Sequence, residues 1–290
     1  MFESGLLKNK RILVTGGGTG LGREMVSRFL ALGAEVHICG RRQGVLEDTA
    51  GELMERHGGK VITHAVDIRV AEAVEEMVTE VWSHGPLDGL VNNAAGNFIS
   101  PSKDLSPRGF DAIANIVFHG TFYVTHAVGR RWIESGRPGS VVSILTTWVW
   151  TGSPFVVPSA MSKAGVEVMT KSLAVEWGPY NIRLNAIAPG TFPTEGMSSR
   201  LFAGQDAAAV EEQNPMRRHG RMPELQNLAT FLIADGCDWL TGQTIALDGA
   251  GYLAGGGTFS QLSRLTDEDW RQVREQIKAG NERDRAKRSV

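Results

Sequence analysis

Residues 15–22 are Thr-Gly-Gly-Gly-Thr-Gly-Leu-Gly, a glycine-rich stretch between two apolar segments. The run before it, 11–14, predicts a short buried strand, and apolar residues recur at helical spacing over 23–32. Strand, glycine loop and helix in this order present backbone N–H groups and a helix N-terminus to a phosphate. Glycine is needed because a Cβ would block the approach of the backbone to a pyrophosphate. The stretch predicts a nucleotide site, with a plain tight turn as the alternative; its spacing does not name the nucleotide.

The rest of the chain repeats the alternation of apolar runs and amphipathic segments. Strands are predicted at 11–15, 35–39, 60–66, 87–91, 139–145, 182–187 and 243–248, and helices at 21–32, 43–57, 70–84, 107–134, 160–177 and 223–234. Apolar strands separated by helices indicate a parallel sheet covered on both faces. The sequence shows no internal repeat and no low-complexity linker. We therefore predict an α/β protein with a Rossmann-type, doubly wound parallel sheet in a single domain.

Two segments depart from this alternation. Residues 190–222 follow a predicted strand and have weak periodicity. Because ligands bind beyond the carboxyl ends of such strands, we predict a substrate lid there, with a surface excursion as the alternative. Thr266 precedes three acidic residues and an amphipathic run, which predicts a capped helix and then a charged tail. The division expected is a domain over 1–265 and a helical tail over 266–290.

Composition excludes several functional classes. A formal net charge of −2 argues against a protein that binds nucleic acid through bulk positive charge. Cys39 and Cys237 form no CxxC pair, which suggests a reducing, intracellular setting. No apolar run approaches the ~20 residues that cross a bilayer, and the first ten residues are too polar for a signal peptide. His119, His126 and His219 are isolated and show no metal-ligand spacing. We expect a cytoplasmic protein without nucleic-acid, membrane or metal partners.

The residues after the second and third predicted strands indicate which nucleotide the site binds. Sites for NAD place an acid after the second strand, where it binds the ribose 2′-OH. This chain has Arg41 and Arg42 there, two guanidinium groups that suit the 2′-phosphate of NADP(H). Asp67 ends the third strand and could accept a hydrogen bond from adenine or cap the next turn.

The glycine loop, the segment Asn92-Asn-Ala-Ala-Gly96, Lys163 and Ala188-Pro-Gly190 together resemble the short-chain dehydrogenase/reductase superfamily. The resemblance covers roughly residues 8–250 and implies a seven-stranded sheet, a nicotinamide cofactor and a homotetramer. Cofactor contacts are expected at Thr15, Gly16, Gly18, Thr19, Gly20, Leu21, Gly22, Arg41, Arg42, Asp67, Ile68, Asn93, Ala94, Ala95, Gly96, Lys163, Pro189, Gly190, Thr191 and Phe192.

Within the superfamily, segments 92–101, 152–166, 171–177 and 266–278 are similar to NADPH-dependent 2,4-dienoyl-CoA reductases. That likeness implies hydride transfer from NADPH to an unsaturated acyl-CoA. It places Arg69, Asn97 and Phe98 at the acyl-CoA site, and Ser159 and Lys163 at the reaction centre. The alternatives are an NADP-dependent carbonyl, 3-oxoacyl or alcohol oxidoreductase and a catalytically weak NADP-binding protein.

Both tyrosines that serve as acids in this superfamily are missing. Most members place Tyr four residues before the lysine, where this chain has Ser159, as the dienoyl-CoA reductases do. The mitochondrial dienoyl-CoA type places Tyr fifteen residues before the lysine, where this chain has Trp148, whose indole donates a hydrogen bond but releases no proton. Our hypothesis is that Lys163, Ser159 and an ordered water deliver the proton, while Asn97 and Trp148 stabilise the oxyanion. A Trp148 that only forms the pocket wall is the alternative.

Overall fold

A computed structural model describes residues 1–194, 211–255, 262 and 265–276 of the chain. The described residues form one seven-stranded sheet in the order β3-β2-β1-β4-β5-β6-β7, and every strand pair is parallel. The strands are β1 Arg11–Thr15, β2 Glu35–Gly40, β3 Lys60–Ala65, β4 Gly89–Asn92, β5 Gly139–Ile144, β6 Ile182–Pro189 and β7 Thr244–Leu247. The order reverses between β1 and β4, which is the position where ligands bind in open parallel sheets. The doubly wound sheet is confirmed.

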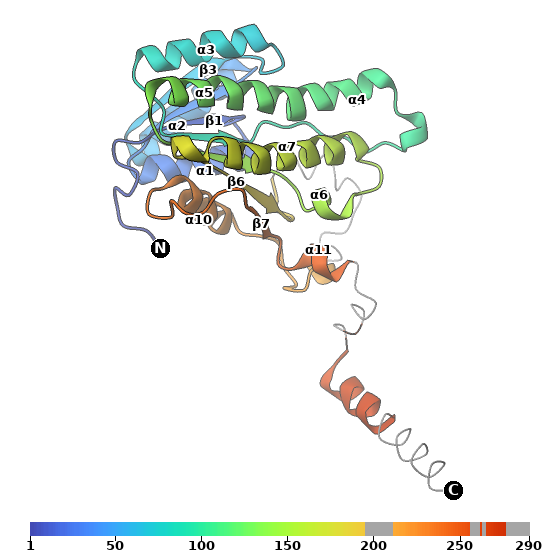
Figure 1. Ribbon diagram of the computed structural model, residues 1–290. Helices are drawn as coiled ribbons and strands as arrows, with labels where there is room; N and C mark the ends of the chain where they lie inside the picture. The colour runs from blue at the N-terminus through green and yellow to red at the C-terminus, as the bar shows by residue number, and fades with distance from the viewer. Residues whose placement is uncertain (195–210, 256–261, 263–264, 277–290) are drawn as a thin grey trace, which may run out of the picture.

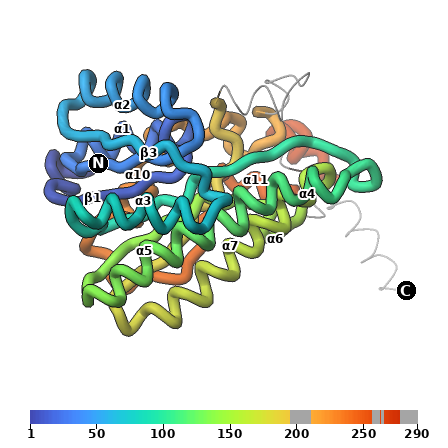
Figure 2. Tube along the Cα trace, turned by 90° about the horizontal axis from the view of Figure 1, so that it is seen from above, coloured from blue at the N-terminus to red at the C-terminus, as the bar shows by residue number. Residues whose placement is uncertain are grey.

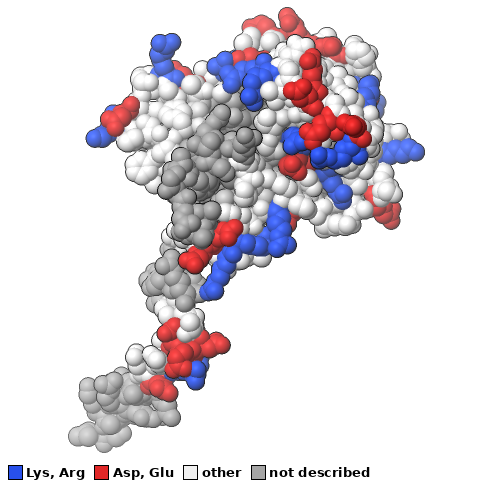
Figure 3. Space-filling view, turned by 180° about the vertical axis from the view of Figure 1, so that it is seen from behind, with Lys and Arg blue, Asp and Glu red and all other residues white. Residues whose placement is uncertain are grey.

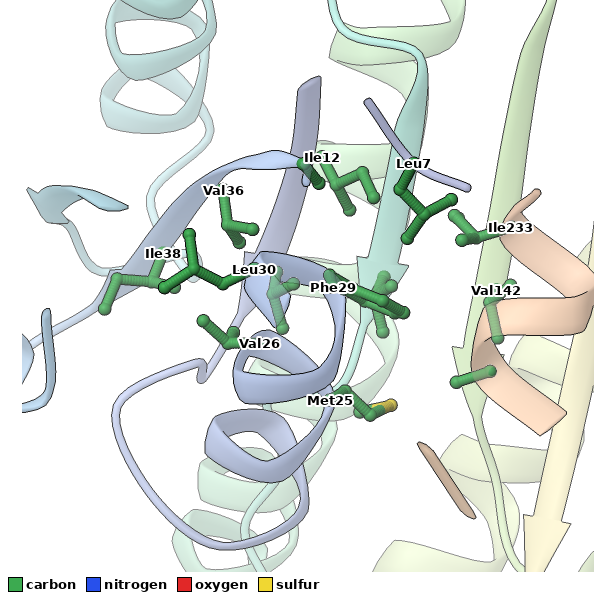
Figure 4. Close-up of a cluster of buried hydrophobic side chains, with 14 of the residues drawn as sticks. Leu7, Ile12, Met25, Val26, Phe29, Leu30, Val36, Ile38, Val142 and Ile233 are labelled. Atoms are coloured by element: carbon green, nitrogen blue, oxygen red, sulfur yellow. The ribbon is translucent and has the colours of Figure 1, made fainter. Parts of the chain in front are cut away.

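Helices cover both faces of the sheet (Figure 1). One layer consists of α1 Gly20–Ala31, α2 Gln43–His57 and α10 Met222–Ile233. Apolar side chains of these helices pack with those of β1 and β2, as Figure 4 shows for Val26 and Phe29 of α1 beside Ile12 and Val36. The other layer consists of α3 Ala71–Ser83, α5 Thr121–Ser135 and α7 Val157–Glu176, which run side by side (Figures 1 and 2). Two large buried clusters result, one on each face, and a third, smaller cluster includes Leu145, Val166 and Ala186.

The predicted elements appear in the expected order, and the largest difference concerns the helix predicted over 107–134. It begins as α4, Pro107–Ala114, and continues through a π-helical segment, Asn115–Gly120, before α5. A Cβ on Gly120 would lie 2.7 Å from the Ile68 side chain, so the chain passes very close to the loop after β3 here. Apolar periodicity cannot reveal such a π turn, because the residues on either side of it keep helical spacing.

The shorter helices lie among the loops and at the C-terminal end. They are η1 Ser102–Asp104, α6 Trp148–Thr151, η3 Gly178–Tyr180 and α11 Gly251–Ala254. Within the predicted lid, 195–210 lie outside the described residues. The predicted tail helix spans 267–276, apart from the sheet in Figure 1. Thr266 Oγ1 accepts a hydrogen bond from the Asp269 backbone N–H at 3.2 Å, which confirms the predicted cap.

Two buried histidines form a hydrogen-bonded chain on β2 and β3. Arg11 Nη2 lies 2.8 Å from His37 Nε2 and has no acceptor of its own, so it donates to that nitrogen. His37 Nδ1 then carries the proton and donates to His64 Nε2 at 2.9 Å. This leaves His64 Nδ1 protonated, 3.7 Å from a Glu80 carboxylate oxygen. Burial, followed by the charge of Arg11, lowers the pKa of His37 to about 4.

The low pKa of the buried His37 predicts that the folded protein loses stability in mild acid. Between pH ~6.5, the ordinary His value, and pH ~4 the unfolded state binds more protons than the folded state, so stability falls as pH falls. The expected loss from His37 is about 3 kcal/mol by pH 4. The measurement is the urea unfolding free energy from pH 7.5 to 4 for the wild type and His37→Gln. The variant is expected to show a flatter pH dependence, whereas the control His126→Gln, at an exposed position, retains the wild-type slope. An unchanged slope in His37→Gln would contradict the assignment.

Candidate active site

A cleft of about 410 Å³ opens at the carboxyl ends of the strands, at the point where the strand order reverses. The loops after β1, β2, β3 and β4 contribute to its lining, as does the beginning of α7. The predicted site residues that line it are Gly16, Gly18, Thr19, Leu21, Arg41, Arg42, Asp67, Ile68, Asn93, Ala94, Ala95, Gly96, Asn97 and Ser159. The fold therefore brings together residues that the sequence separates by more than a hundred positions.

The glycine loop is shaped by contacts that no side chain could replace. Gly16 and Gly20 have φ values of +64° and +56°, in the left-handed region that favours glycine. A Cβ on Gly22 would lie 2.3 Å from the Gly16 carbonyl oxygen. The loop begins α1 at Gly20, so backbone N–H groups and the helix N-terminus face the cleft. A backbone that only glycine allows at Gly16 and Gly22, beside a helix N-terminus, fits a pyrophosphate.

Thr15 and Asn93 hold this loop against the end of β4. Thr15 is buried, and its hydroxyl oxygen accepts hydrogen bonds from the backbone N–H groups of Asn93 and Ala94, both at 3.0 Å. Asn93 Nδ2 donates in return to the carbonyl oxygens of Thr15, at 3.0 Å, and Gly16, at 3.1 Å. Thr15 therefore supports the cleft from beneath rather than lining it.

Arg41 and Arg42 lie at the cleft beside the N-terminus of α2. Both are exposed, and neither forms an ion pair or hydrogen bond through its side chain with the described residues. The Thr49 hydroxyl donates to the Gly18 carbonyl oxygen at 2.8 Å, which fixes α2 against the glycine loop. Two uncommitted guanidinium groups thus stand next to the loop that would hold a pyrophosphate.

Asp67 and Arg69 bind one another at the end of β3. Arg69 Nε lies 2.9 Å from both carboxylate oxygens, and the Arg69 backbone N–H donates to Asp67 Oδ1 at 3.1 Å. These bonds, with the charges of Arg69 and Arg41, hold the pKa of Asp67 below its ordinary value. Asp67 therefore caps the turn, as one alternative predicted, and also lines the cleft. Arg69 does not line the cleft in this arrangement.

Ser159 and Lys163 lie one helical turn apart on α7, so the four-residue spacing places them on the same side of the helix. Ser159 lines the cleft, whereas Lys163 is buried behind it with 8% exposure. Lys163 Nζ donates a hydrogen bond to the Ile144 carbonyl oxygen at the end of β5. Burial lowers the pKa of Lys163 to about 8, which makes its ammonium group a stronger acid than an exposed lysine.

The side chains of Asn97 and Trp148 offer hydrogen-bond donors. Asn97 Oδ1 accepts a bond from the Phe98 backbone N–H at 2.9 Å, which fixes the amide orientation. Within the described part of the chain, neither Asn97 Nδ2 nor the indole N–H of Trp148 has a hydrogen-bond partner. Trp148 is the first residue of α6 and is half-buried. The Phe98 ring packs beside Gly109 of α4, 3.5 Å from the position of a Cβ there.

The segment 189–192 does not line the cleft. Phe192 is 2% exposed and packs against Gly220, whose backbone N–H donates to the Thr191 carbonyl oxygen at 2.9 Å. A Cβ on Gly190 would lie 2.8 Å from the Asp248 Cα, so this turn is held tightly against the residue that follows β7. The segment returns to the cleft at Thr194, close to Gly20.

Sequence reasoning missed seven cleft-lining residues: Cys39, Gly40, Val45, Leu46, Val66, Ile116 and Thr194. Cys39, Gly40 and Val66 directly precede predicted contacts, so extending the predicted contacts backward by one or two residues would have found them. Ile116 reaches the cleft from the π-helical segment, and Leu46 from α2. No local sequence signal marks these two positions.

The described residues include neither a membrane-spanning helix nor a metal-binding cluster. No helix in this part of the chain is both long and apolar enough to span a membrane. The described histidine, cysteine, aspartate and glutamate side chains form no group of three or more that could hold a metal ion. On the face seen in Figure 3, acidic and basic side chains are interspersed.

Comparisons with known proteins agree with this geometry. Residues 16–252 match the family described as enoyl-(acyl carrier protein) reductase. A probable (3E)-enoyl-CoA-producing 2,4-dienoyl-CoA reductase of Caenorhabditis elegans is 44% identical over 86% of this chain and 82% of its own. A probable (2E)-enoyl-CoA-producing 2,4-dienoyl-CoA reductase of Bacillus subtilis is 38% identical over 85% of this chain and 98% of its own.

Solved structures show the same relationship. A short-chain dehydrogenase from Bacillus anthracis is 38% identical, with a TM-score of 0.76, over 84% of this chain and 96% of its own. A putative short-chain alcohol dehydrogenase from Sinorhizobium meliloti is 34% identical, with a TM-score of 0.80, over 86% of this chain and 98% of its own. The chain therefore belongs to the short-chain dehydrogenase/reductase family of oxidoreductases.

Proposed function

We propose that this protein is an NADPH-dependent reductase of unsaturated acyl-CoA thioesters, of the 2,4-dienoyl-CoA type. One observation carries the proposal: Asn97 and Ser159 line the same cleft as the glycine loop, with the buried Lys163 one turn behind Ser159. The similarity to probable 2,4-dienoyl-CoA reductases supports it. The serine in place of tyrosine also argues against ketone reduction, in which the tyrosine protonates the carbonyl oxygen.

The cofactor-binding half of the cleft fits NADPH. The N–H groups of the glycine loop would hold the pyrophosphate, Arg41 and Arg42 the 2′-phosphate, and Asp67 the adenine. We propose that the nicotinamide extends beyond the cleft described above to the backbone of 189–192, and that Lys163 contacts the nicotinamide ribose. When bound, NADPH supplies the hydride; the chain orients the substrate, polarises it and supplies the proton.

We propose that Asn97 and Trp148 stabilise the negative charge that the reaction develops. Addition of hydride at C5 of a 2,4-dienoyl thioester moves an electron pair through the conjugated system to the thioester oxygen, giving a dienolate. Asn97 Nδ2 and the Trp148 indole N–H have no other partners among the described residues and could donate to this oxygen. A preorganised donor of this kind is worth roughly 3 kcal/mol in the transition state.

The proton then comes from the Lys163 side of the cleft. Lys163, with a pKa of about 8, can release a proton near neutral pH, and Ser159 and an ordered water would relay it to C2 of the dienolate. The product is a 3-enoyl thioester, which has gained the hydride at C5 and the proton at C2. Phe98 and Arg69 would contact the acyl-CoA; Arg69 must exchange its Asp67 contact to do so.

The proposed activity is tested by following NADPH oxidation at 340 nm with a 2,4-dienoyl-CoA, a 2-enoyl-CoA and a 3-oxoacyl-CoA. We expect the dienoyl-CoA to react with the highest kcat/KM, by at least about tenfold. Preference for the 3-oxoacyl-CoA would instead indicate a carbonyl reductase. Tight NADPH binding without turnover of any substrate would indicate an NADP-binding protein of another role.

We further propose that the protein is a homotetramer. Exposed apolar residues gather on the π-helical segment, α5 and α7: Phe118, Phe122, Met161, Val168 and Val175 are 43–81% exposed. Three of them follow a seven-residue spacing on α7, so they form one stripe on that helix. Contiguous exposed apolar surface of this kind marks an interaction site. Light scattering of the full chain is expected to give a four-chain mass, and a one-chain mass would contradict the assembly.

A further inference from the structure

Two loops that adjoin cleft-lining residues present apolar side chains to solvent. Ile99, between β4 and α4, is 51% exposed, and Phe155, between α6 and α7, is 54% exposed. The Ser100 backbone N–H donates to the Phe155 carbonyl oxygen at 2.9 Å, so the two loops are joined at this point. The pair consequently belongs to one hydrogen-bonded unit, although 56 positions separate the two residues.

Phe155 occupies a backbone conformation that a bulky side chain rarely adopts. Its φ is +65°, in the left-handed region, where a Cβ and an aromatic ring are disfavoured. Such conformations persist only where the surroundings impose them, and they concentrate at binding and catalytic sites. A glycine would fit this turn with less strain, so the local backbone does not account for a phenylalanine. The exposed ring is the feature that remains to be explained.

Each residue of the apolar pair lies within a few positions of a polar residue that lines the cleft. Asn97 lies two residues before Ile99, and Ser159 lies four residues after Phe155, in the first turn of α7. Both polar residues line the cleft. At ~3.8 Å per residue, Asn97 and Ile99 are at most ~8 Å apart along the chain. If Asn97 binds the carbonyl group of an acyl substrate, the alkyl chain next to that carbonyl can reach the exposed side chain of Ile99.

We propose that Ile99 and Phe155 form the binding surface for the alkyl tail of the acyl thioester and set the preference for chain length. This inference rests on the proposed function, because it requires an acyl substrate with its carbonyl at Asn97. Apolar burial favours each added methylene by up to about fourfold in affinity. Ile99 and Phe155 would contact only one side of the tail. Each of the first methylenes beyond the cleft is therefore expected to increase the affinity by a smaller factor.

The test compares the binding of hexanoyl-CoA and decanoyl-CoA by the full chain loaded with NADP⁺, measured by calorimetry. The wild type is expected to bind decanoyl-CoA at least about tenfold more tightly. Phe155→Gly suits the positive φ and so should keep the loop and the melting temperature. It is expected to reduce the decanoyl-to-hexanoyl preference at least about fivefold, with hexanoyl-CoA binding changed less than twofold. Ile99→Ala is expected to act in the same direction.

Trp239→Ala is the matched control. Trp239 is also an exposed aromatic residue, at 100% exposure, but it precedes β7 and so lies toward the opposite end of the strands. It should leave the preference unchanged. An unaltered preference in both Phe155→Gly and Ile99→Ala would overturn the inference. So would an equal loss for both ligands together with a changed oligomeric mass, which would assign the pair to contact with a second copy of this chain.

Binding and turnover separate this inference from the proposed reaction. If the wild type shows a chain-length preference that Phe155→Gly removes, yet does not reduce a 2,4-dienoyl-CoA, the alkyl surface stands and the proposed reaction fails. If the wild type reduces dienoyl-CoA but the variants keep its preference, the reaction stands and the alkyl surface fails. Absence of acyl-CoA binding by the wild type overturns the inference directly.

Discussion

Replacing Lys163 by methionine is expected to lower kcat/KM for a dienoyl-CoA by about three orders of magnitude, within the range for loss of a general acid. The same change is expected to stabilise the protein at pH 7 by about 1–2 kcal/mol. Burial lowers the pKa of Lys163 to about 8, so keeping it charged at pH 7 costs roughly 3 kcal/mol. Loss of its hydrogen bond to the buried Ile144 carbonyl offsets part of that gain.

The sign of the pH dependence makes this prediction specific. The folded-state pKa of Lys163 is about 8, whereas the unfolded lysine titrates near pH ~10.4. Between these values the unfolded state binds more protons, so the wild type gains stability relative to Lys163→Met as pH rises. The advantage of the variant should therefore shrink by about 2 kcal/mol between pH 7 and 9.5.

Urea unfolding at pH 7 and 9.5 measures both effects. The control is Lys8→Met, at an exposed position near the N-terminus, which should change neither activity nor the pH dependence. A variant that is less stable than the wild type at pH 7 would show that Lys163 anchors the fold, and would remove the basis for treating it as a strained catalytic acid.

Replacing Arg41 and Arg42 together by alanine is expected to raise KM for NADPH by about 100-fold and leave KM for NADH within about threefold. Charge-assisted bonds to a phosphate contribute roughly 1.5–3 kcal/mol each, and NADH lacks the 2′-phosphate that would receive them. Neither arginine is committed to an ion pair with the described residues, so their loss leaves no buried carboxylate unpaired.

Initial rates at varied NADPH and NADH measure this change in selectivity. Arg56→Ala, at an exposed position in the last turn of α2, is the control and should keep the wild-type ratio of KM values. Equal loss for both cofactors would place the arginines elsewhere than at the 2′-phosphate. An unchanged KM for NADPH would leave them as solvated residues at a helix start.

The sequence predicted the fold well because each of its signals is local. The apolar strands, the amphipathic helices and the glycine loop between β1 and α1 depend on residues within one turn or strand. The lining of the cleft at Arg41, Asn93 and Ser159 followed from motifs whose positions in such a sheet are fixed.

What the sequence did not predict depends on local backbone geometry without a sequence signal and on contacts between distant segments. The pairing of Asp67 with Arg69 depends on the turn geometry after β3, and Ile116 lines the cleft from a π-helical segment that the apolar spacing does not reveal. The left-handed Phe155 is the clearest case. Phenylalanine gives no local signal for positive φ. The hydrogen bond between the Ser100 backbone N–H and the Phe155 carbonyl oxygen joins the segment after β4 to the segment after β5, which are far apart in the sequence.

The most direct test of the central claim is the fate of the hydride. NADPH carrying deuterium at both C4 positions is mixed with the enzyme and a 2,4-dienoyl-CoA, and the acyl-CoA product is analysed by mass spectrometry and NMR. We predict one deuterium in the product, at C5 of a 3-enoyl-CoA, with the second hydrogen coming from solvent at C2. Oxidation of the deuterated cofactor with no deuterium in the acyl chain would contradict the proposed reaction.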